Sequence, residues 1–510
     1  MKSTVCEKSS KRSLLAPAGA SLLLLIACIL FFAAQWYVHV FGRMGFDAIL
    51  FTLSNLQGTS GDMVHQFILS VLVPAAVLTA LLVFLLYFKH CRSRELHFRN
   101  RCVTVYPVRQ HTDTKLCCAL SALLLLHAAF NSGLIRYIGQ MLTSSAFIEE
   151  QYVDPDTVAI EFPEERRNLI YIFMESMETS FLAEELGGTL EETAIPELYT
   201  LAHNNVNFSH NDDVGGYVPM EGMKWTIAGM VSQTAGVPLK TPTGIQGNDY
   251  GKNGLFLPGI TTLMDILSQE GYYQAVMFGS DAAFAGRDAY YKSHGTDQIY
   301  DYYTAITDEV IPQGYEVWWG FEDAKLFPYA KDKLTELAAQ DQPFSFTLLT
   351  ADTHHVDGYL CPDCPDDYPE QYENVYACSS RKVADFVEWI QQQDFYENTT
   401  IILCGDHCSM DNAFFKRNAD DDYERHVYNC IINPAAEAVQ EKNRTFTAVD
   451  LFPTTLAAMG CEIEGNRLGL GTNLFSDVPT LSEEFGFDFV DNHMGRYSRF
   501  YQDTFLQPVA

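Results

Sequence analysis

Basic residues are scarce in this sequence. It has 33 Lys and Arg against 65 Asp and Glu, which gives a formal net charge of −32. A nucleic-acid-binding protein generally needs a basic face to meet the phosphates, so the composition excludes that class. Internal repeats and low-complexity tracts are also absent. The chain is rich in apolar residues, 47% of 510, which excludes a mostly disordered protein and allows more than one folding unit.

Charge is unevenly distributed along the chain. Residues 1–115 carry a net charge of about +7, and the remainder carries about −39. The slightly basic first part also contains the long apolar runs. We therefore expect the two parts to occupy different solvents, the first in lipid and the second in water.

Three apolar runs predict membrane-spanning helices. They cover residues 13–40, 67–88 and 116–138. The first two reach the length of about 20 residues that crosses a bilayer. The third is weaker because His127 and Arg136 interrupt it. A buried core helix remains an alternative for each run, most of all for the third.

The positions of Lys and Arg predict the orientation in the membrane. Basic residues gather before the first run and between the second and third runs, whereas only Arg43 lies between the first two. Basic loops remain in the cytoplasm, so the chain after about residue 140 should lie outside. A cleaved signal peptide fits less well, because the first run is too long and no small-residue cleavage site follows it. We expect a membrane domain at 1–138, a linker at 139–165 and an extracytoplasmic domain at 166–510.

Short, β-rich apolar runs alternate with helical patterns from about residue 165 onward. Such runs are typical of strands that are buried on both faces of a parallel sheet. Their alternation with helices predicts an α/β fold with a doubly wound, mostly parallel sheet. The expected strands are 169–174, 274–279, 344–350, 400–405 and 427–433, and the expected helices are 260–269, 321–339, 380–393 and 448–459.

Seven of the 13 cysteines lie in the part that we expect to be exported. Cys361 and Cys364, together with Cys378, flank a short Pro/Asp-rich loop that a disulfide could close in an oxidising compartment. A zinc site at Cys361 and Cys364 would need a second cysteine pair, and no matching pair is present. The sequence leaves the disulfide pattern open.

Ionisable residues directly follow three of the expected strands. Glu175 follows the first strand, Asp352 and His354 follow the third, and Asp406 with His407 follows the fourth. Ligands of open α/β sheets bind at the carboxyl ends of the strands, and carboxylate with imidazole suits Mn²⁺ or Zn²⁺. A capping role is the alternative for each residue alone, but it explains the whole set poorly.

Thr226 is the candidate nucleophile. It opens an apolar run that looks helical as far as Gly236. A Thr at this position is usually a helix N-cap. Alternatively, the helix N-terminus binds an anion there, and a nearby divalent cation activates the Thr hydroxyl. Spacing alone leaves both interpretations open.

Five segments stand in a fixed order along the chain: YIFMES, WTIAGMVSQTAGVPL, FAGRDAYYKSHG, DTHHVDGY and GDH. Together they resemble the lipoteichoic acid synthase and phosphoglycerol transferase family. That family is a membrane-anchored branch of the alkaline phosphatase/sulfatase superfamily, and the subgroup that modifies periplasmic glucans is the most similar. The resemblance covers roughly residues 165–475. It implies a sulfatase-like catalytic domain, outside the bacterial inner membrane, on a multi-pass anchor.

The resemblance also implies roles for single residues. The basic substrate contact falls on Arg287, and the histidine that contacts phosphoglycerol, which could also shuttle a proton, falls on His354. Lipoteichoic acid synthases have a Trp two residues before that Arg, where this sequence has Ala285, so the resemblance does not extend to their acceptor. The implied ligands of one divalent metal, Mn²⁺ with Zn²⁺ or Mg²⁺ as alternatives, are Glu175, Thr226, Asp406 and His407, with Thr226 also the nucleophile.

The implied reaction is a double displacement. Thr226 Oγ would attack the phosphorus of phosphatidylglycerol, release diacylglycerol, and carry phosphoglycerol until an acceptor hydroxyl takes it. The acceptor is an envelope glycan or a polyglycerolphosphate chain, and the sequence does not choose between them.

Three alternatives remain at this point. A sulfatase would need Cys or Ser in a C/S-x-P-x-R context, which is absent near residue 226. A phosphoethanolamine transferase also uses Thr, but its cationic head group should favour carboxylates rather than Arg287. A catalytically inactive ectodomain that binds envelope polymers would not need to retain the complete set of implied metal ligands.

Overall fold

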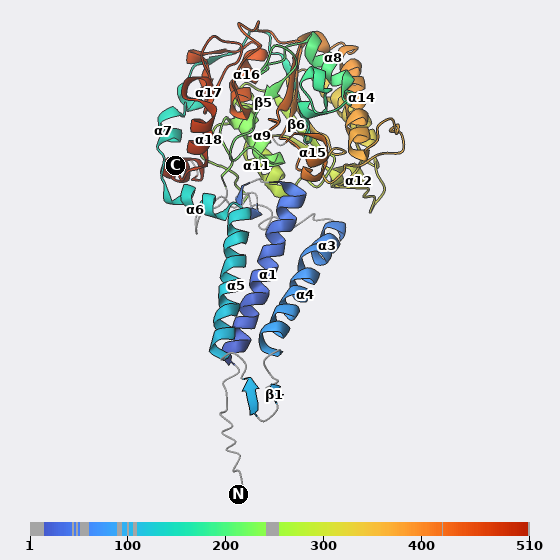
Figure 1. Cartoon of the computed structure of the whole chain (residues 1–510). Helices are drawn as coiled ribbons and strands as arrows, with labels where there is room; N and C mark the ends of the chain where they lie inside the picture. The colour runs from blue at the N-terminus through green and yellow to red at the C-terminus, as the bar shows by residue number, and fades with distance from the viewer. Residues whose placement is uncertain are drawn as a thin grey trace. The chain divides into compact units, whose positions relative to one another are not determined.

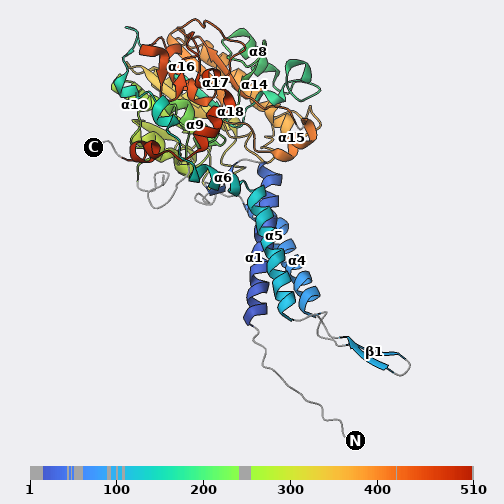
Figure 2. The ribbon, with the colours of Figure 1, turned by 60° about the vertical axis from the view of Figure 1, so that its left-hand side comes forward.

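A computed structural model describes residues 15–42, 45–46, 49–50, 61–88, 94–98, 101–105, 110–240, 254–420 and 422–507. The chain divides into two compact units. Unit 1 consists of residues 1–43 and 59–136, and unit 2 consists of residues 44–58 and 137–510. Figures 1 and 2 show both units, and each is described below by itself.

Unit 1 contains three helices that are long and apolar enough to cross a membrane, at Ala16–Phe41, Val64–Leu86 and Asp113–Asn131. The first two lie close to their predicted positions. The third begins and ends earlier than predicted, so Arg136 lies beyond it instead of interrupting it. The helices are α1 (Leu15–Phe41), a second one formed by α3 (Gly61–Phe67), η1 (Ile68–Leu72), α4 (Val73–Val83) and η2 (Phe84–Phe88), and α5 (Gln110–Asn131).

Helix α1 packs against both α4 and α5 (Figure 1). Large apolar side chains point away from this contact: Leu126 is 60% exposed and Phe130 is 70% exposed. Helices buried in a protein core would not have such an exterior, whereas lipid-facing helices do. Small side chains, which allow close approach, lie with Leu24 at the buried centre of this contact, at Ala20, Cys28, Ala75 and Cys117.

The orientation of these helices stays a prediction. Between η2 and α5, the described residues form an antiparallel hairpin of β1 (Arg94–Phe98) and β2 (Arg101–Val105). Most of the basic residues that predict the orientation lie outside the described residues, namely Lys2, Lys8, Lys11, Arg12, Arg43, Lys89, Arg92, Arg99 and Arg109.

Unit 2 is built on a seven-stranded sheet with the order β5-β10-β9-β4-β8-β6-β7. Five consecutive strands, from β9 to the edge strand β7, are parallel, and β10 runs antiparallel to both β9 and β5. All five predicted strands are present. The strands are β4 (Asn168–Met174), β5 (Gly216–Tyr217), β6 (Tyr273–Phe278), β7 (Gln298–Tyr300), β8 (Phe344–Leu349), β9 (Thr399–Gly405) and β10 (Val427–Ile432).

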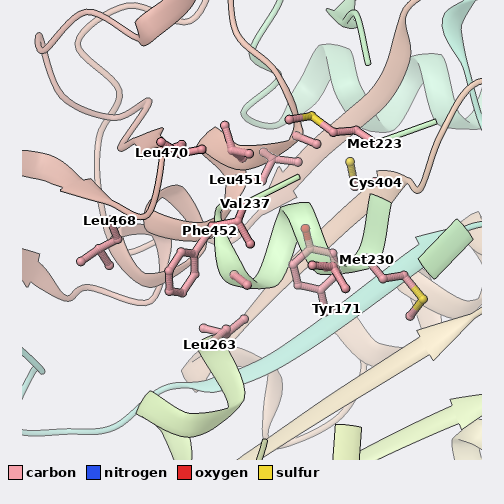
Figure 3. Close-up of a cluster of buried hydrophobic side chains, with 14 of the residues drawn as sticks. Tyr171, Met223, Met230, Val237, Leu263, Cys404, Leu451, Phe452, Leu468 and Leu470 are labelled. Atoms are coloured by element: carbon pink, nitrogen blue, oxygen red, sulfur yellow. The ribbon is translucent and has the colours of Figure 1, made fainter. Parts of the chain in front are cut away.

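Both faces of the sheet are covered by helices. Alternate residues of β4 enter two separate cores: Tyr171 and Phe173 belong to one, and Ile170 and Ile172 belong to the other. The first core includes residues of α9 (Thr226–Ala235), α10 (Leu263–Gln269) and α16 (Leu451–Ala458), and Figure 3 shows its side chains around α9. The second includes residues of α8 (Pro196–Asn204), α13 (Asp323–Ala338) and α14 (Gln371–Gln391). The predicted α/β fold is confirmed, although α14 begins nine residues before its predicted start.

The segment 139–165, expected to be a linker, is folded as part of unit 2. Phe147 is 5% exposed, and Ile148 has no exposed surface. Strand β3 (Ile160–Glu161) pairs with β11 (Glu462–Ile463) near the other end of the unit. The acidic residues of this segment mask these few apolar contacts in the sequence, and the predicted domain boundaries stay a prediction.

Shorter elements complete the described part of unit 2. They are α6 (Leu134–Leu142, which begins in unit 1), α7 (Phe147–Gln151), α11 (Arg287–Ser293), α12 (Tyr302–Thr307), α15 (Asn412–Asn418), α17 (Leu481–Phe485), α18 (Phe487–Gly495), η10 (Tyr501–Phe505), β12 (Arg467–Leu468) and β13 (Gly471–Thr472).

A disulfide joins Cys364 and Cys378, which decides the pairing that the sequence left open. Cys361 is a free thiol beside it. Two of the three sulfurs are therefore bonded to each other, and the alternative of a zinc site at Cys361 and Cys364 does not apply to this state.

Helix α9 approaches the sheet through a glycine. A Cβ added at Gly229 would lie 1.9 Å from the backbone oxygen of Asp406, in the loop after β9. A side chain at this position would push the helix away from that loop. Gly229 therefore allows the start of α9 and the end of β9 to lie close together.

We predict that Gly229→Ala destabilises unit 2 by about 1–3 kcal/mol, because the extra methyl group overpacks a backbone contact that has no room to relax. Thermal unfolding of the purified protein measures the loss. Gly139→Ala is the matched control, since a Cβ at Gly139 meets nothing within 4 Å. Equal unfolding temperatures for the two variants would contradict this account of the close approach.

Candidate active site

The register of the sheet places Glu175 and Asp406 side by side. Met174 of β4 is paired with Gly405 of the parallel strand β9, so the next residue of each strand emerges at the same edge. Both carboxylates and the neighbouring His407 are fully buried. His407 Nε2 lies 3.5 Å from Glu175 Oε1 and 3.4 Å from Asp406 Oδ2. The sheet thus gathers three of the predicted ligands at one point.

Backbone amides bind only one of the two carboxylate oxygens of Asp406. The N–H groups of Ser176 and His407 donate to Asp406 Oδ1 at 2.7 and 2.9 Å. Asp406 Oδ2 is buried and accepts no hydrogen bond. A buried oxygen of this kind needs a partner, because desolvation without one is costly.

A backbone hydrogen bond fixes the ring of His407. Its Nδ1 donates to the carbonyl oxygen of Cys408 at 2.8 Å. That bond leaves Nε2 facing the two carboxylates, the arrangement by which proteins usually orient a histidine that binds metal.

The pKa values of these groups reflect their mutual charges. Burial and the charge of Glu175 raise the pKa of Asp406 to about 8. Burial alone would lower the pKa of His407, but the charges of Asp406 and Glu175 raise it to about 9. Burial alone would raise the pKa of Glu175, yet its hydrogen bond with His407 and the charge of that ring hold it well below its usual range. Positive charge in this buried site therefore stabilises the two carboxylates.

Glu175, Asp406 and His407 fit a divalent cation. Each offers a ligand atom, and the three atoms lie within 4.8 Å of one another. Asp406 Oδ2, which accepts no hydrogen bond, and His407 Nε2, which faces both carboxylates, are available as ligand atoms. Two carboxylates with one imidazole suit Mn²⁺ or Zn²⁺.

Thr226 is the first residue of α9, and Trp225 occupies the N-cap position. The Thr226 hydroxyl donates to Glu175 Oε2 at 3.2 Å and lies 3.3 Å from His407 Nε2. The N-cap interpretation of Thr226 is therefore wrong. Its hydroxyl joins the carboxylate–imidazole cluster instead.

Arg287, at the start of α11, has no exposed surface. Its Nη2 donates to Ser280 Oγ at 2.9 Å and to the carbonyl oxygen of Asp281 at 2.6 Å, and its Nε donates to the carbonyl oxygen of Phe284 at 3.2 Å. Its Nη1 is buried without a hydrogen-bond partner. Burial lowers the pKa of Arg287 to about 10, so the guanidinium still carries its charge at neutral pH.

Trp319 contacts both Arg287 and His354. The guanidinium is 4.8 Å from the centre of the Trp319 ring, and the His354 ring stacks on the same indole at 4.3 Å. Burial lowers the pKa of His354, so its imidazole is neutral at neutral pH. One indole therefore links the two residues that the sequence assigns to substrate contacts.

The sequence did not indicate Trp319 as a site residue. The side chain brings no acid, base or ligand atom, and an aromatic residue is more often part of a core. Two further supports were also not predicted: Thr353 Oγ1 donates to the Glu175 carbonyl oxygen, and the Tyr376 hydroxyl donates to the Ser176 carbonyl oxygen.

Comparison with known proteins identifies the family. A family described as Sulfatase matches residues 167–461, more than half of the chain. Phosphoglycerol transferase I of Escherichia coli O127:H6 is 30% identical over 453 residues, which cover 86% of this chain and 54% of that protein. Phosphoglycerol transferase I of Citrobacter koseri is 30% identical over 457 residues, with the same coverage. The chain spans about half the length of these curated relatives.

Among solved structures, the lipoteichoic acid synthase LtaP from Listeria monocytogenes has a TM-score of 0.49 and 17% identity, covering 65% of this chain and 82% of that one. The resemblance to phosphoglycerol transferases that the sequence motifs carry is confirmed by the relatives of that name. From the matched residues 167–461, this chain belongs to the sulfatase family.

Proposed function

We propose that this chain is an enzyme that transfers phosphoglycerol from phosphatidylglycerol to an envelope glycan or a polyglycerolphosphate chain. One observation carries the proposal. The Thr226 hydroxyl, at the start of α9, lies within 3.3 Å of both Glu175 and His407, beside the unpartnered oxygen of Asp406. The names of the curated relatives support the phosphoglycerol group.

In the first step, Thr226 Oγ attacks the phosphorus of the lipid. A bond forms between Oγ and phosphorus, the bond to the diacylglycerol oxygen breaks, and that oxygen takes a proton to leave as diacylglycerol. Glu175, Asp406 and His407 would hold a divalent cation, which supplies the positive charge that favours the ionised hydroxyl. Mn²⁺ is our first choice, with Zn²⁺ or Mg²⁺ as alternatives.

Arg287 binds the phosphoryl oxygens in this proposal. Its charge is fixed by three donated hydrogen bonds, and its buried Nη1 is left to donate to the substrate. A donor that is already oriented needs no rearrangement as negative charge develops. Trp319 keeps the guanidinium and the His354 ring in place by stacking against both.

His354 moves the proton in both steps. Its neutral imidazole can accept a proton from an entering hydroxyl and return it to a leaving oxygen. In the second step, an acceptor hydroxyl attacks the phosphorus of phosphoglycerol-Thr226. The bond to Oγ then breaks, the hydroxyl of Thr226 is restored, and the group has moved to the acceptor.

The membrane anchor suits a lipid donor. Three apolar helices of unit 1 are long enough to span the bilayer. With the orientation that the basic loops predict, the catalytic domain faces the outer side of a bacterial inner membrane. The buried positive charge of Arg287 favours the glycerol head group over ethanolamine, whose cationic group it would repel.

We predict that Thr226→Ala abolishes diacylglycerol release from tail-labelled phosphatidylglycerol, because it removes the only atom that attacks phosphorus. The assay uses the purified full chain with Mn²⁺. Thr226→Ser is the matched control, since it keeps the hydroxyl and should retain measurable release. Release by Thr226→Ala at the wild-type rate would reject Thr226 as the nucleophile.

We predict that Asp406→Ala loses one bound divalent metal per chain, because Asp406 supplies a buried carboxylate oxygen that accepts no hydrogen bond. Elemental analysis of purified protein gives the stoichiometry. The control is Asp341→Ala, which removes an exposed carboxylate and should leave the metal content unchanged. Equal metal content in Asp406→Ala and Asp341→Ala would show that Asp406 is not a metal ligand.

We predict that Arg287→Lys lowers the rate of diacylglycerol release by about 10²-fold or more while the metal content stays constant. A lysine keeps the charge, but it cannot bond to Ser280, Asp281 and substrate with the same rigid geometry. Steady-state assays together with elemental analysis separate the two effects. An unchanged rate would show that Arg287 does not contact the phosphoryl group.

A further inference from the structure

A second cluster of reactive side chains surrounds the Cys364–Cys378 disulfide, and the proposed transfer reaction does not use it. The free thiol of Cys361 lies 3.1 Å from Cys364 Sγ. All three sulfurs lie within 4.8 Å of one another. The thiol is therefore close enough to a disulfide sulfur for thiol–disulfide exchange.

Lys382 supplies a positive charge to this cluster. Its ammonium lies 3.2 Å from Cys361 Sγ and 3.9 Å from Cys364 Sγ. A salt bridge of 2.8 Å to Asp352, which is 3% exposed, fixes the ammonium from the other side. Exchange proceeds through a thiolate, so a fixed cation beside the attacking sulfur stabilises the charge that the reaction requires.

Cys378, the far residue of the disulfide, lines a cavity. The cavity has a volume of about 390 Å³ and is lined in part by Cys378, Arg381, Lys382 and Phe386. Cys361 is not part of this lining and is only 2% exposed. Cys378 is also buried, at 5% exposed, but it lines a cavity large enough for a small molecule, whereas Cys361 does not.

We propose that Cys361, Cys364 and Cys378 form a thiol–disulfide exchange site that presents Cys378 for modification. The Cys361 thiolate attacks Cys364 Sγ, a Cys361–Cys364 bond forms, and the Cys364–Cys378 bond breaks. Cys378 leaves as a thiolate and takes the proton that Cys361 gave up. One thiol and one disulfide exist before and after, so the step consumes no oxidant or reductant. The ligand of the site is a small thiol-reactive molecule that enters the cavity. It is either an activated double bond, to which Cys378 Sγ adds while the neighbouring carbon takes a proton, or a small disulfide, whose S–S bond breaks as its other half leaves as a thiolate.

The exchange is tested by trapping Cys378. The purified full chain is incubated with N-ethylmaleimide at neutral pH without reductant, and samples are taken over time. Cleavage at acidic residues then separates the three cysteines, because Asp363 lies between Cys361 and Cys364, and Glu373 lies between Cys364 and Cys378. We expect maleimide to accumulate on Cys378 together with a Cys361–Cys364 disulfide. Alkylated Cys378 cannot re-form its disulfide with Cys364, so labelling shifts the exchange toward the Cys361–Cys364 form.

Two variants make the result specific. Cys361→Ser removes the attacking sulfur and should leave Cys378 unlabelled, with the Cys364–Cys378 disulfide intact. Lys382→Gln should slow the labelling of Cys378 about tenfold or more, since it removes a charge next to the nucleophile. Wild-type protein that keeps the Cys364–Cys378 disulfide throughout, with maleimide on Cys361 or on none of the three, would overturn the proposal. Equal labelling of Cys378 in Cys361→Ser and in the wild-type protein would also overturn the proposal.

Discussion

Two carboxylates and one imidazole share a space without solvent at the ends of β4 and β9. Glu175, Asp406 and His407 have no exposed surface, and Asp406 Oδ2 has no hydrogen-bond partner. Negative charge in such a place is stable only beside positive charge. His407 therefore lowers the pKa of Glu175, and the charges of Asp406 and Glu175 raise the pKa of His407. A divalent cation would balance this charge more completely, and the Thr226 hydroxyl lies next to Glu175 and His407 at the same point.

Several elements are needed to keep this charged cluster together. The parallel register of β4 and β9 aligns the carboxylates, and Gly229 lets α9 bring Thr226 against them. Thr353, after β8, bonds to the backbone of Glu175, and Tyr376 of α14 bonds to that of Ser176. Elements from both faces of the sheet thus meet at one edge. The geometry of the site is a property of the whole layered fold rather than of a local motif.

The sequence predicted the parts of the fold that have a strong local signal. Apolar β-rich runs revealed the five main strands, and the ionisable residues after them revealed Glu175, Asp406 and His407. Strands β5 and β7 have two and three residues, too few to show a pattern. The burial of residues such as Phe147 was not predicted, because they lie in a segment rich in acidic residues. Trp319 was missed because its role depends on two residues that are distant in sequence, Arg287 and His354.

The central claim is that Thr226 carries the phosphoglycerol group between donor and acceptor. Purified protein mixed with phosphatidylglycerol, without acceptor, can be quenched in acid and digested with trypsin, which releases the peptide from Trp225 to Lys240. The account predicts that part of this peptide gains the mass of one phosphoglycerol group, with fragmentation placing it on Thr226. Diacylglycerol release with the added mass on another residue would contradict it.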